Sequence, residues 1–90
     1  MSAAFFSPGQ VVITANARDR LHPADVPHCL ARHLSGDWGE LCEEDRAENQ
    51  RSLQQGGRLF SVYHDRNQVK LYIITEPDSS TTTILLPEDY

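Results

Sequence analysis

The hydrophobic pattern of the chain changes its period at Gly56-Gly57. Before this pair, the apolar side chains of residues 26–34 recur at the three- and four-residue spacing of one helix face. After it, residues 58–64 alternate between two faces, which is the pattern of a half-buried β-strand. A helical half followed by a strand half predicts an α+β layer, and the chain length predicts a single domain over residues 1–90.

Two main helices are predicted in the N-terminal half. The first is Asp25–Leu34, with Asp25 as its N-cap and Gly36 as the left-handed residue that ends it. The second begins at about Cys42 and ends before Gly56. A shorter helix is expected at residues 15–21. The apolar side of the second main helix is thin, so we expect it to lie on the surface.

The two helices are expected to pack on an antiparallel sheet of three to four strands. A turn is predicted at residues 65–68, where Asn67 is expected to adopt a positive φ, and a second turn at 76–79. A β-branched run at residues 10–14 is expected to join the sheet at an edge. The C-terminal strands form a meander over residues 58–64, 69–75 and 80–86.

The charge balance argues against duplex DNA as a direct partner. The formal net charge is −5, and the eight Lys and Arg residues are scattered rather than gathered in a stripe. A basic partner protein suits this charge. No apolar run approaches the roughly 18 residues of a membrane span, and residues 1–10 lack the basic start of a signal peptide. With only Cys29 and Cys42 present, a reducing cytoplasm is the expected location.

Acidic residues gather around the start of the second main helix. The helix dipole favours negative charge there, which explains the acids as a solvated helix start. In the functional interpretation, these acids form a surface that binds another protein. A more specific version is that the spaced carboxylates imitate the phosphate backbone of a nucleic acid. The candidate binding residues are Asp37, Trp38, Glu40, Glu43, Glu44, Asp45 and Glu48.

Trp38 lies in the bend Gly36-Asp37-Trp38-Gly39 between the two main helices. It is expected either to anchor a partner or, as is more usual for the only tryptophan of a small domain, to fill the core. In the core its indole N–H is expected to bond a backbone carbonyl. The two glycines are expected to allow a tight turn, with Asp37 bonding nearby amides.

A small nuclease-like enzyme is the alternative interpretation. Such an enzyme needs a base, an acid and a cation, which His33, Glu76, Arg58 and His64 could supply. Cys29, His33 and Cys42 could approximate a zinc site, with His28 or Asp37 as a further ligand, but only one closely spaced ligand pair is present. No metal and no cofactor are therefore predicted.

Five short motifs are spread over residues 22–90. They are Arg32-His33-x-x-Gly36-Asp37-Trp38-Gly39, Glu44-Asp45-x-x-x-Asn49, Gly57-Arg58-x-x-Ser61-x-Tyr63, Ile73-Ile74-Thr75-Glu76 and Thr82-Thr83-x-Leu85-Leu86-Pro87-Glu88-x-Tyr90. Together they resemble a family of small bacterial proteins carried on plasmids and integrative elements, some of them loosely labelled as type I restriction proteins. The resemblance implies a mobile-element context and a cytosolic protein, but no particular activity. Pro77-Asp78-Ser79-Ser80 departs from the Ala-Asp-Arg-Ser expected in the family, which removes a cation from that turn.

These observations predict a non-catalytic accessory protein of a bacterial mobile element. It is expected to bind another protein through the acidic helix and the Gly36–Gly39 bend. The more specific versions of this hypothesis are a nucleic-acid mimic and an inhibitor of a defence system.

Overall fold

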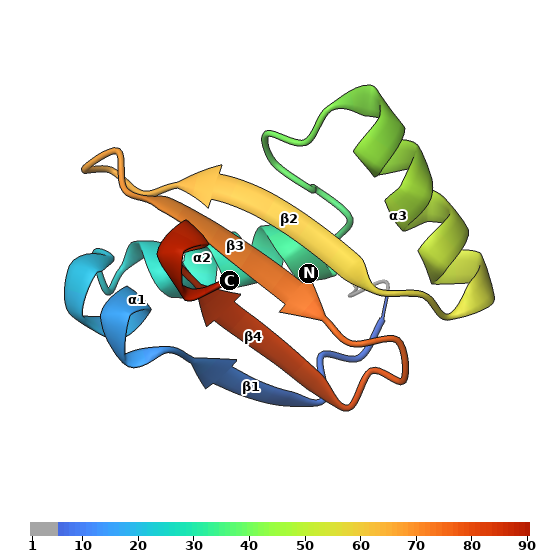
Figure 1. Cartoon of the computed structure of the whole chain (residues 1–90), viewed down its shortest axis with the longest axis horizontal. Coiled ribbons are helices and arrows are strands. Elements are labelled where there is room, and N and C mark those ends of the chain that lie inside the picture. Colours follow the sequence, from blue (N-terminus) through green and yellow to red (C-terminus); the bar gives the residue numbers. More distant parts are fainter. Residues whose placement is uncertain (1–5) are drawn as a thin grey trace.

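The computed structural model of the protein describes residues 6–90, and it has the predicted α+β fold. Three helices, a four-stranded sheet and a final 3-10 turn follow one another along the chain (Figure 1). In chain order the elements are β1 (Gln10–Ile13), α1 (Ala15–Arg20), α2 (Asp25–Leu34), α3 (Glu43–Gln55), β2 (Leu59–His64), β3 (Lys70–Thr75), β4 (Thr81–Leu85) and η1 (Pro87–Asp89).

The sheet has the strand order β1-β4-β3-β2, with β1 and β2 at its two edges. The C-terminal meander is antiparallel as predicted, since β3 pairs antiparallel with both β2 and β4. β1 joins at an edge, as expected, but it runs parallel to β4 and so makes the sheet mixed rather than purely antiparallel. Two hydrogen bonds fix the ends of β1. The Gln10 N–H donates to the Ser80 carbonyl at 2.9 Å, and the Thr14 N–H donates to the Ile84 carbonyl at 3.0 Å.

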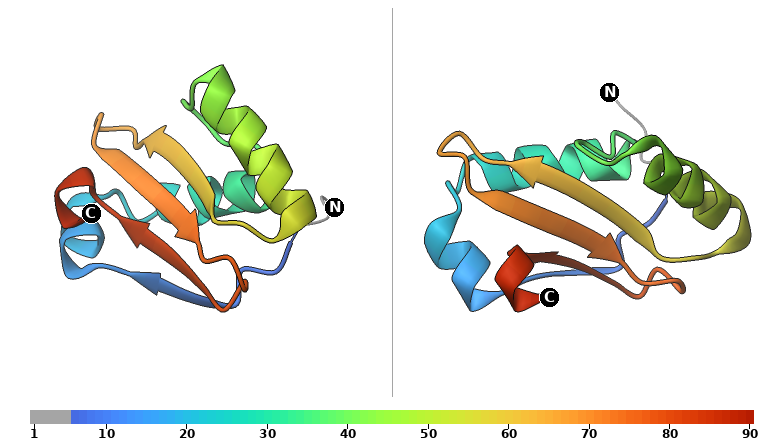
Figure 2. Two further views of the ribbon diagram at one scale, coloured as in Figure 1. Left: turned by 45° about the vertical axis from the view of Figure 1, so that its right-hand side comes forward. Right: turned by 45° about the horizontal axis from the view of Figure 1, so that its top comes forward.

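One face of the sheet carries the main core. Tyr63, Leu71, Ile73 and Ile84 point from the strands toward Cys29 of α2, and α1 adds the buried Ala17 at one end. The opposite face, which includes the half-buried Phe60 and Tyr72, has no helix across its middle (Figures 1 and 2). α3 lies beside β2 at one edge of the sheet, so its outer surface is free.

Two local predictions were wrong. Asp25 is the first residue of α2, and the N-cap is Ala24, which makes no capping bond through its side chain. The Asp25 carboxylate instead accepts bonds from the backbone and guanidinium of Arg66, at 2.9 to 3.1 Å. In the first hairpin, the positive φ falls at Gln68 rather than Asn67. The Asp65 carboxylate accepts the Asn67 N–H at 2.9 Å, which holds Asn67 in the turn and moves the left-handed residue one place on.

No helix in residues 6–90 combines the length and the apolar character needed to cross a membrane.

Candidate functional site

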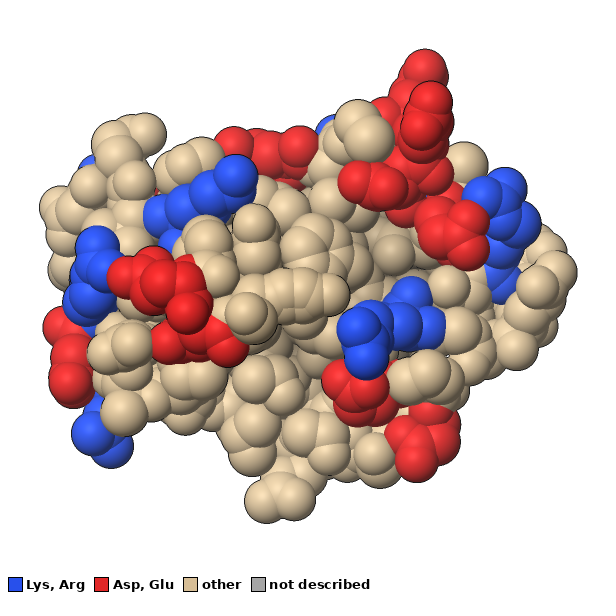
Figure 3. Space-filling model, viewed as in Figure 1, with Lys and Arg blue, Asp and Glu red and all other residues tan. Residues whose placement is uncertain are grey.

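α3 holds its acidic residues on the outer surface of the molecule. Glu43, Glu44 and Asp45 occupy its first turn and Glu48 the second, and all four are exposed. Figure 3 shows acidic atoms gathered over α3 and a largely uncharged area over the middle of the sheet. The acidic surface predicted from the sequence is therefore accessible.

Asn49 fastens α3 to the edge of the sheet. Its side-chain amide donates to the Phe60 carbonyl at 2.7 Å and accepts the Phe60 N–H at 3.1 Å. The side chain thus satisfies both main-chain groups that β2 turns outward at this position, as a neighbouring strand would. Ser52 and Leu53 add the remaining inward side chains of a helix that is otherwise polar.

A groove of about 460 Å³ lies between α3 and the uncovered sheet face. Its α3 wall is built from positions i, i+3, i+4 and i+7, which share one face of a helix. Phe60 of β2 and the exposed ring of Tyr90 supply its aromatic surface, with ring centroids 6.5 Å apart. The lining residues are Asp45, Glu48, Asn49, Ser52, Gly57, Arg58, Phe60 and Tyr90.

The charges near this groove are unequally compensated. Arg58 pairs with Glu76, with 3.4 Å between Nη2 and Oε1, and Glu48 pairs with Arg51 one turn further along α3. Asp45, like Glu43 and Glu44, has no ion-pair partner among residues 6–90. The free negative charge therefore lies at the start of α3, and through Asp45 it reaches the lining of the groove.

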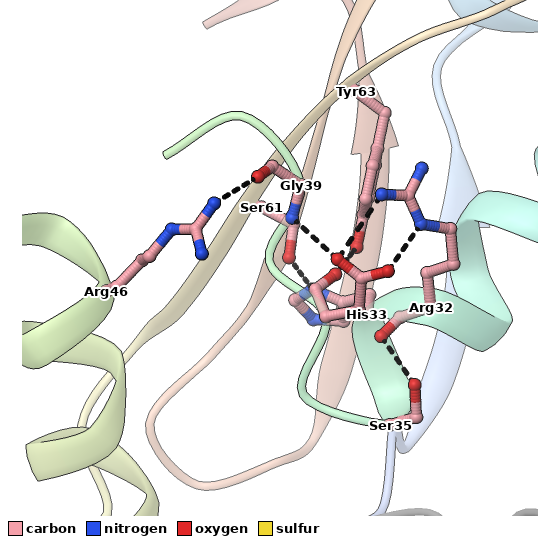
Figure 4. A network of polar contacts seen from close by, with 8 residues as sticks. Arg32, His33, Ser35, Gly39, Arg46, Ser61 and Tyr63 are labelled. Carbon is pink, nitrogen blue, oxygen red and sulfur yellow. Dashed lines mark hydrogen bonds and ion pairs between the residues drawn. The ribbon is translucent and has the colours of Figure 1, made fainter. Parts of the chain in front are cut away.

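Asp37 and Glu40, the other two acidic candidates, are already paired. The Arg32 guanidinium bonds the Asp37 carboxylate at 2.8 and 3.3 Å and, with the Gly39 N–H, holds the pKa of that carboxyl below its usual value (Figure 4). Glu40 lies 2.7 Å from His64 Nδ1. These two residues contribute less than α3 to the free negative charge.

The Gly36–Gly39 bend closes the edge of the sheet. Glu40 N–H donates to the Val62 carbonyl at 2.8 Å, and Val62 N–H donates to the Trp38 carbonyl at 3.2 Å. Gly36 and Gly39 have φ of 83° and 74°, as expected for tight turns at these positions. A Cβ at Gly39 would lie 2.1 Å from the Val62 carbonyl oxygen, so only glycine fits.

Trp38, predicted among the binding residues, is 4% exposed. It packs with Leu41, Leu59 and Val62, and Phe6 stacks on its ring at 6.3 Å between centroids. The ring is therefore a core residue and is not presented to a partner. The expected bond from its indole N–H to a carbonyl is not formed, since Nε1 has no hydrogen-bond partner in the described part of the chain.

A chain of hydroxyls continues through the buried ring of His33. Thr82 Oγ1 donates to the Pro8 carbonyl at 2.7 Å, so it accepts from Thr75 Oγ1, also 2.7 Å away. Thr75 in turn accepts from His33 Nε2 at 2.9 Å, which leaves His33 Nδ1 to accept from Ser61 Oγ at 2.5 Å. The donor order makes His33 a neutral imidazole protonated at Nε2. Burial lowers its pKa to about 4, in agreement with the neutral form.

The four residues of the nuclease interpretation do not form one site. His33 is 0% exposed and both its ring nitrogens are occupied, so no external substrate can reach it. Arg58 and Glu76 pair at the start of β2. His64 lies at the other end of that strand, about 20 Å away at the usual rise per residue.

The candidate zinc ligands do not form a cluster in the described part of the chain. Cys29 is buried and Cys42 exposed, and both thiols are free. Within residues 6–90, no three His, Cys, Asp or Glu side chains gather closely enough to hold a metal ion.

Comparisons with protein-family models, curated proteins and solved structures gave no match to this chain. Its function is therefore inferred from the accessible α3 surface and the groove beside it.

Proposed function

We propose that this protein is a non-catalytic binding protein that holds a basic surface of another protein against α3. The observation that carries the proposal is the position of unpaired carboxylates beside an aromatic groove. Asp45, Phe60 and Tyr90 all line the groove. A Lys or Arg side chain entering the groove would meet a carboxylate and the face of an aromatic ring, two groups that attract a cation.

The size of the groove favours a protein segment over a single small group. Its volume of about 460 Å³ is open along one side and accommodates two or three side chains. Glu43 and Glu44 extend the negative surface beyond the groove along the exposed start of α3. A partner with several spaced cations would therefore find more contacts than an isolated cation.

The polar residues of the core support a binding role over an enzymatic one. His33, Ser61, Thr75 and Thr82 are all buried and bonded to one another in a single chain. They stabilise the contact between α2 and the sheet, which explains their presence without catalysis.

The mobile-element context and a cytosolic location are part of the same proposal, and the motif resemblance supports them. In that context we propose that the partner is a protein whose basic surface ordinarily binds nucleic acid. Such surfaces carry the excess of Lys and Arg that the start of α3 would attract.

The experiment is affinity capture from a bacterial lysate, with mass spectrometry of the captured protein and titration of the purified pair. The double variant Glu44→Gln/Asp45→Asn removes two charges and preserves side-chain size. We expect it to weaken binding by about tenfold or more, corresponding to about 1.4 kcal/mol, and to flatten the salt dependence. The matched control Asp19→Asn/Glu88→Gln removes two exposed acids elsewhere and is expected to bind like the wild type. Equal binding by all three proteins, or capture of an acidic partner, would contradict the proposal.

A further inference from the structure

The two edges of the sheet differ in whether their outward main-chain groups are hydrogen-bonded. At the β2 edge, the outward main-chain groups of Phe60 bond the Asn49 side chain, and those of Val62 bond the Gly36–Gly39 bend and Glu40. This edge is closed to further strands, because its donors and acceptors at these positions are satisfied within the chain.

At the other edge, β1 turns two residues outward. The N–H groups of Gln10 and Thr14 bond carbonyls at the two ends of β4. Because the main-chain groups of every second residue in a strand point the same way, those of Val12 also point toward β4. The N–H and C=O groups of Val11 and Ile13 therefore point away from the sheet. Within residues 6–90, β1 pairs with β4 alone, and no other segment lies along its outer side (Figure 1).

The side chains of this edge lack the usual protection against strand addition. Val11 and Ile13 are 42% and 37% exposed, which makes them two of the three exposed large hydrophobic residues in the described chain. No charged residue occurs before Arg18, and β1 contains no proline. Natural edge strands usually carry such residues to prevent pairing with another chain.

A small apolar groove continues from this edge onto the helix-covered face. Its volume is about 240 Å³, and all but one of its lining side chains are apolar. The lining residues are Ile13, Arg18, Leu21, Pro23, Val26 and Pro27. A strand added beside β1 would place its own side chains next to this groove.

We propose that the strand added at this edge is β1 of a second copy, so that two sheets join into one across a two-fold axis. In antiparallel pairing centred on Val12, Val11 faces Ile13 of the second copy and Ile13 faces its Val11. Residues that face each other in this way exchange both main-chain bonds, so all four outward N–H groups and all four outward C=O groups of the two strands are satisfied.

The same register matches the side chains. Val12 meets Val12 of the second copy on one face, and Val11 meets Ile13 on the other, which gives three apolar pairs of β-branched residues. Shifting the register by two residues would bring Ala15, the first residue of α1, into the pair in one direction and Gly9, which precedes β1, in the other, and either shift would lose strand bonds. The strand is therefore complementary to itself in one register, as an isologous interface requires.

The first measurement is the mass of the purified full chain in solution by light scattering over a range of concentrations. We expect a dimer of about 20 kDa, twice the 10.2 kDa of the chain. A monomer at up to about 1 mM, where even a dimer with a dissociation constant of about 1 mM is visible, would overturn the proposal. That result would leave the edge to a strand of another protein.

Amide hydrogen exchange then locates the interface. The amides of Val11 and Ile13 are expected to be protected, and their protection to rise with protein concentration. A dimer in which these two amides exchange freely would overturn the proposal, because the contact would then lie elsewhere.

A charged variant provides the matched test. Ile13→Lys places a cation at the outward edge and is expected to weaken the dimer at least tenfold, with the thermal melt extrapolated to low concentration little changed. Gln54→Lys adds the same charge at an exposed position of α3 and is expected to leave the dimer intact. Dissociation by Gln54→Lys, but not by Ile13→Lys, would assign the contact to α3. Since β1 and β2 lie at opposite edges, partner capture through α3 succeeds or fails independently of this result.

Discussion

Asn49 pairs with Phe60 as a strand would, through one donated and one accepted hydrogen bond of 2.7 and 3.1 Å. A single side chain on a polar helix thereby fixes α3 to the edge of the sheet. Because α3 contributes few apolar contacts, the position of the acidic surface depends on this one amide.

We expect Asn49→Ala to cost about 2–4 kcal/mol of unfolding free energy, since it leaves two main-chain groups of β2 without a partner. Urea unfolding measures this loss. Gln50→Ala changes an exposed neighbour on the same helix and is expected to stay within about 0.5 kcal/mol of the wild type. Equal stability of the two variants would show that Asn49 does not hold the helix.

His33 predicts a specific dependence of stability on pH. Its pKa is about 4 in the folded protein and near 6.5 in the unfolded chain. Between these values the unfolded chain binds a proton that the folded protein does not, so stability falls as the pH drops from 6.5 to 4. The total loss is about 3 kcal/mol, at up to about 1.4 kcal/mol per pH unit.

The control for this effect is His33→Gln, which removes the titrating group. Its stability at pH 7 is expected to be lower, because the hydroxyl chain is interrupted, but its slope between pH 6.5 and 4 is expected to be smaller by one proton. Carboxyls with lowered pKa values, such as those of Asp25 and Asp37, act below this range in both proteins. Identical slopes would exclude His33 as the source. NMR of the ring is expected to show the tautomer protonated at Nε2.

The fold was largely predictable because burial of one face imposes a period on the sequence. The alternation in residues 58–64 and the helical spacing in 26–34 gave the types and approximate bounds of these elements. The parallel direction of β1 was not predictable, since its partner β4 is distant in the sequence and leaves no local signal.

The candidate site was predicted only in part. The acids of α3 appear in the sequence as a run of charged residues. The groove, and the bonds by which Asn49 closes the β2 edge of the sheet, depend on how α3 packs against β2. The sequence does contain a feature that indicates the role of His33. Ser61, Thr75 and Thr82 place hydroxyls at inward strand positions that are otherwise apolar. Such buried hydroxyls need partners, and a histidine on the facing helix is a suitable one.

Trp38 is expected to report its burial directly by fluorescence, since it is the only tryptophan of the chain. With 4% of its surface exposed, its emission is expected to be shifted to the blue and protected from acrylamide. Unfolding in urea is expected to remove both effects. Quenching of the native protein as strong as that of the unfolded chain would place the ring on the surface, where it could contact a partner after all.

Gly39 and Gly56 separate the effect of close packing from the effect of backbone conformation. Both have positive φ, 74° and 80°. A Cβ at Gly39 would lie 2.1 Å from the Val62 carbonyl oxygen, whereas a Cβ at Gly56 would lie 3.9 Å from the carbonyl oxygen of Pro77 and meet nothing closer outside its chain neighbours. Gly56→Ala is therefore expected to cost about 1–2 kcal/mol for the left-handed conformation alone.

Gly39→Ala carries the same conformational cost and adds a collision with the backbone of β2. The bend can relieve this collision only by moving away from Val62, which breaks the two main-chain bonds that close this edge of the sheet. We expect a loss of about 3 kcal/mol or more in urea unfolding, together with faster exchange of the Val62 amide. A loss no larger than that of Gly56→Ala would mean that the bend is not held against β2, and that the β2 edge is open at Val62.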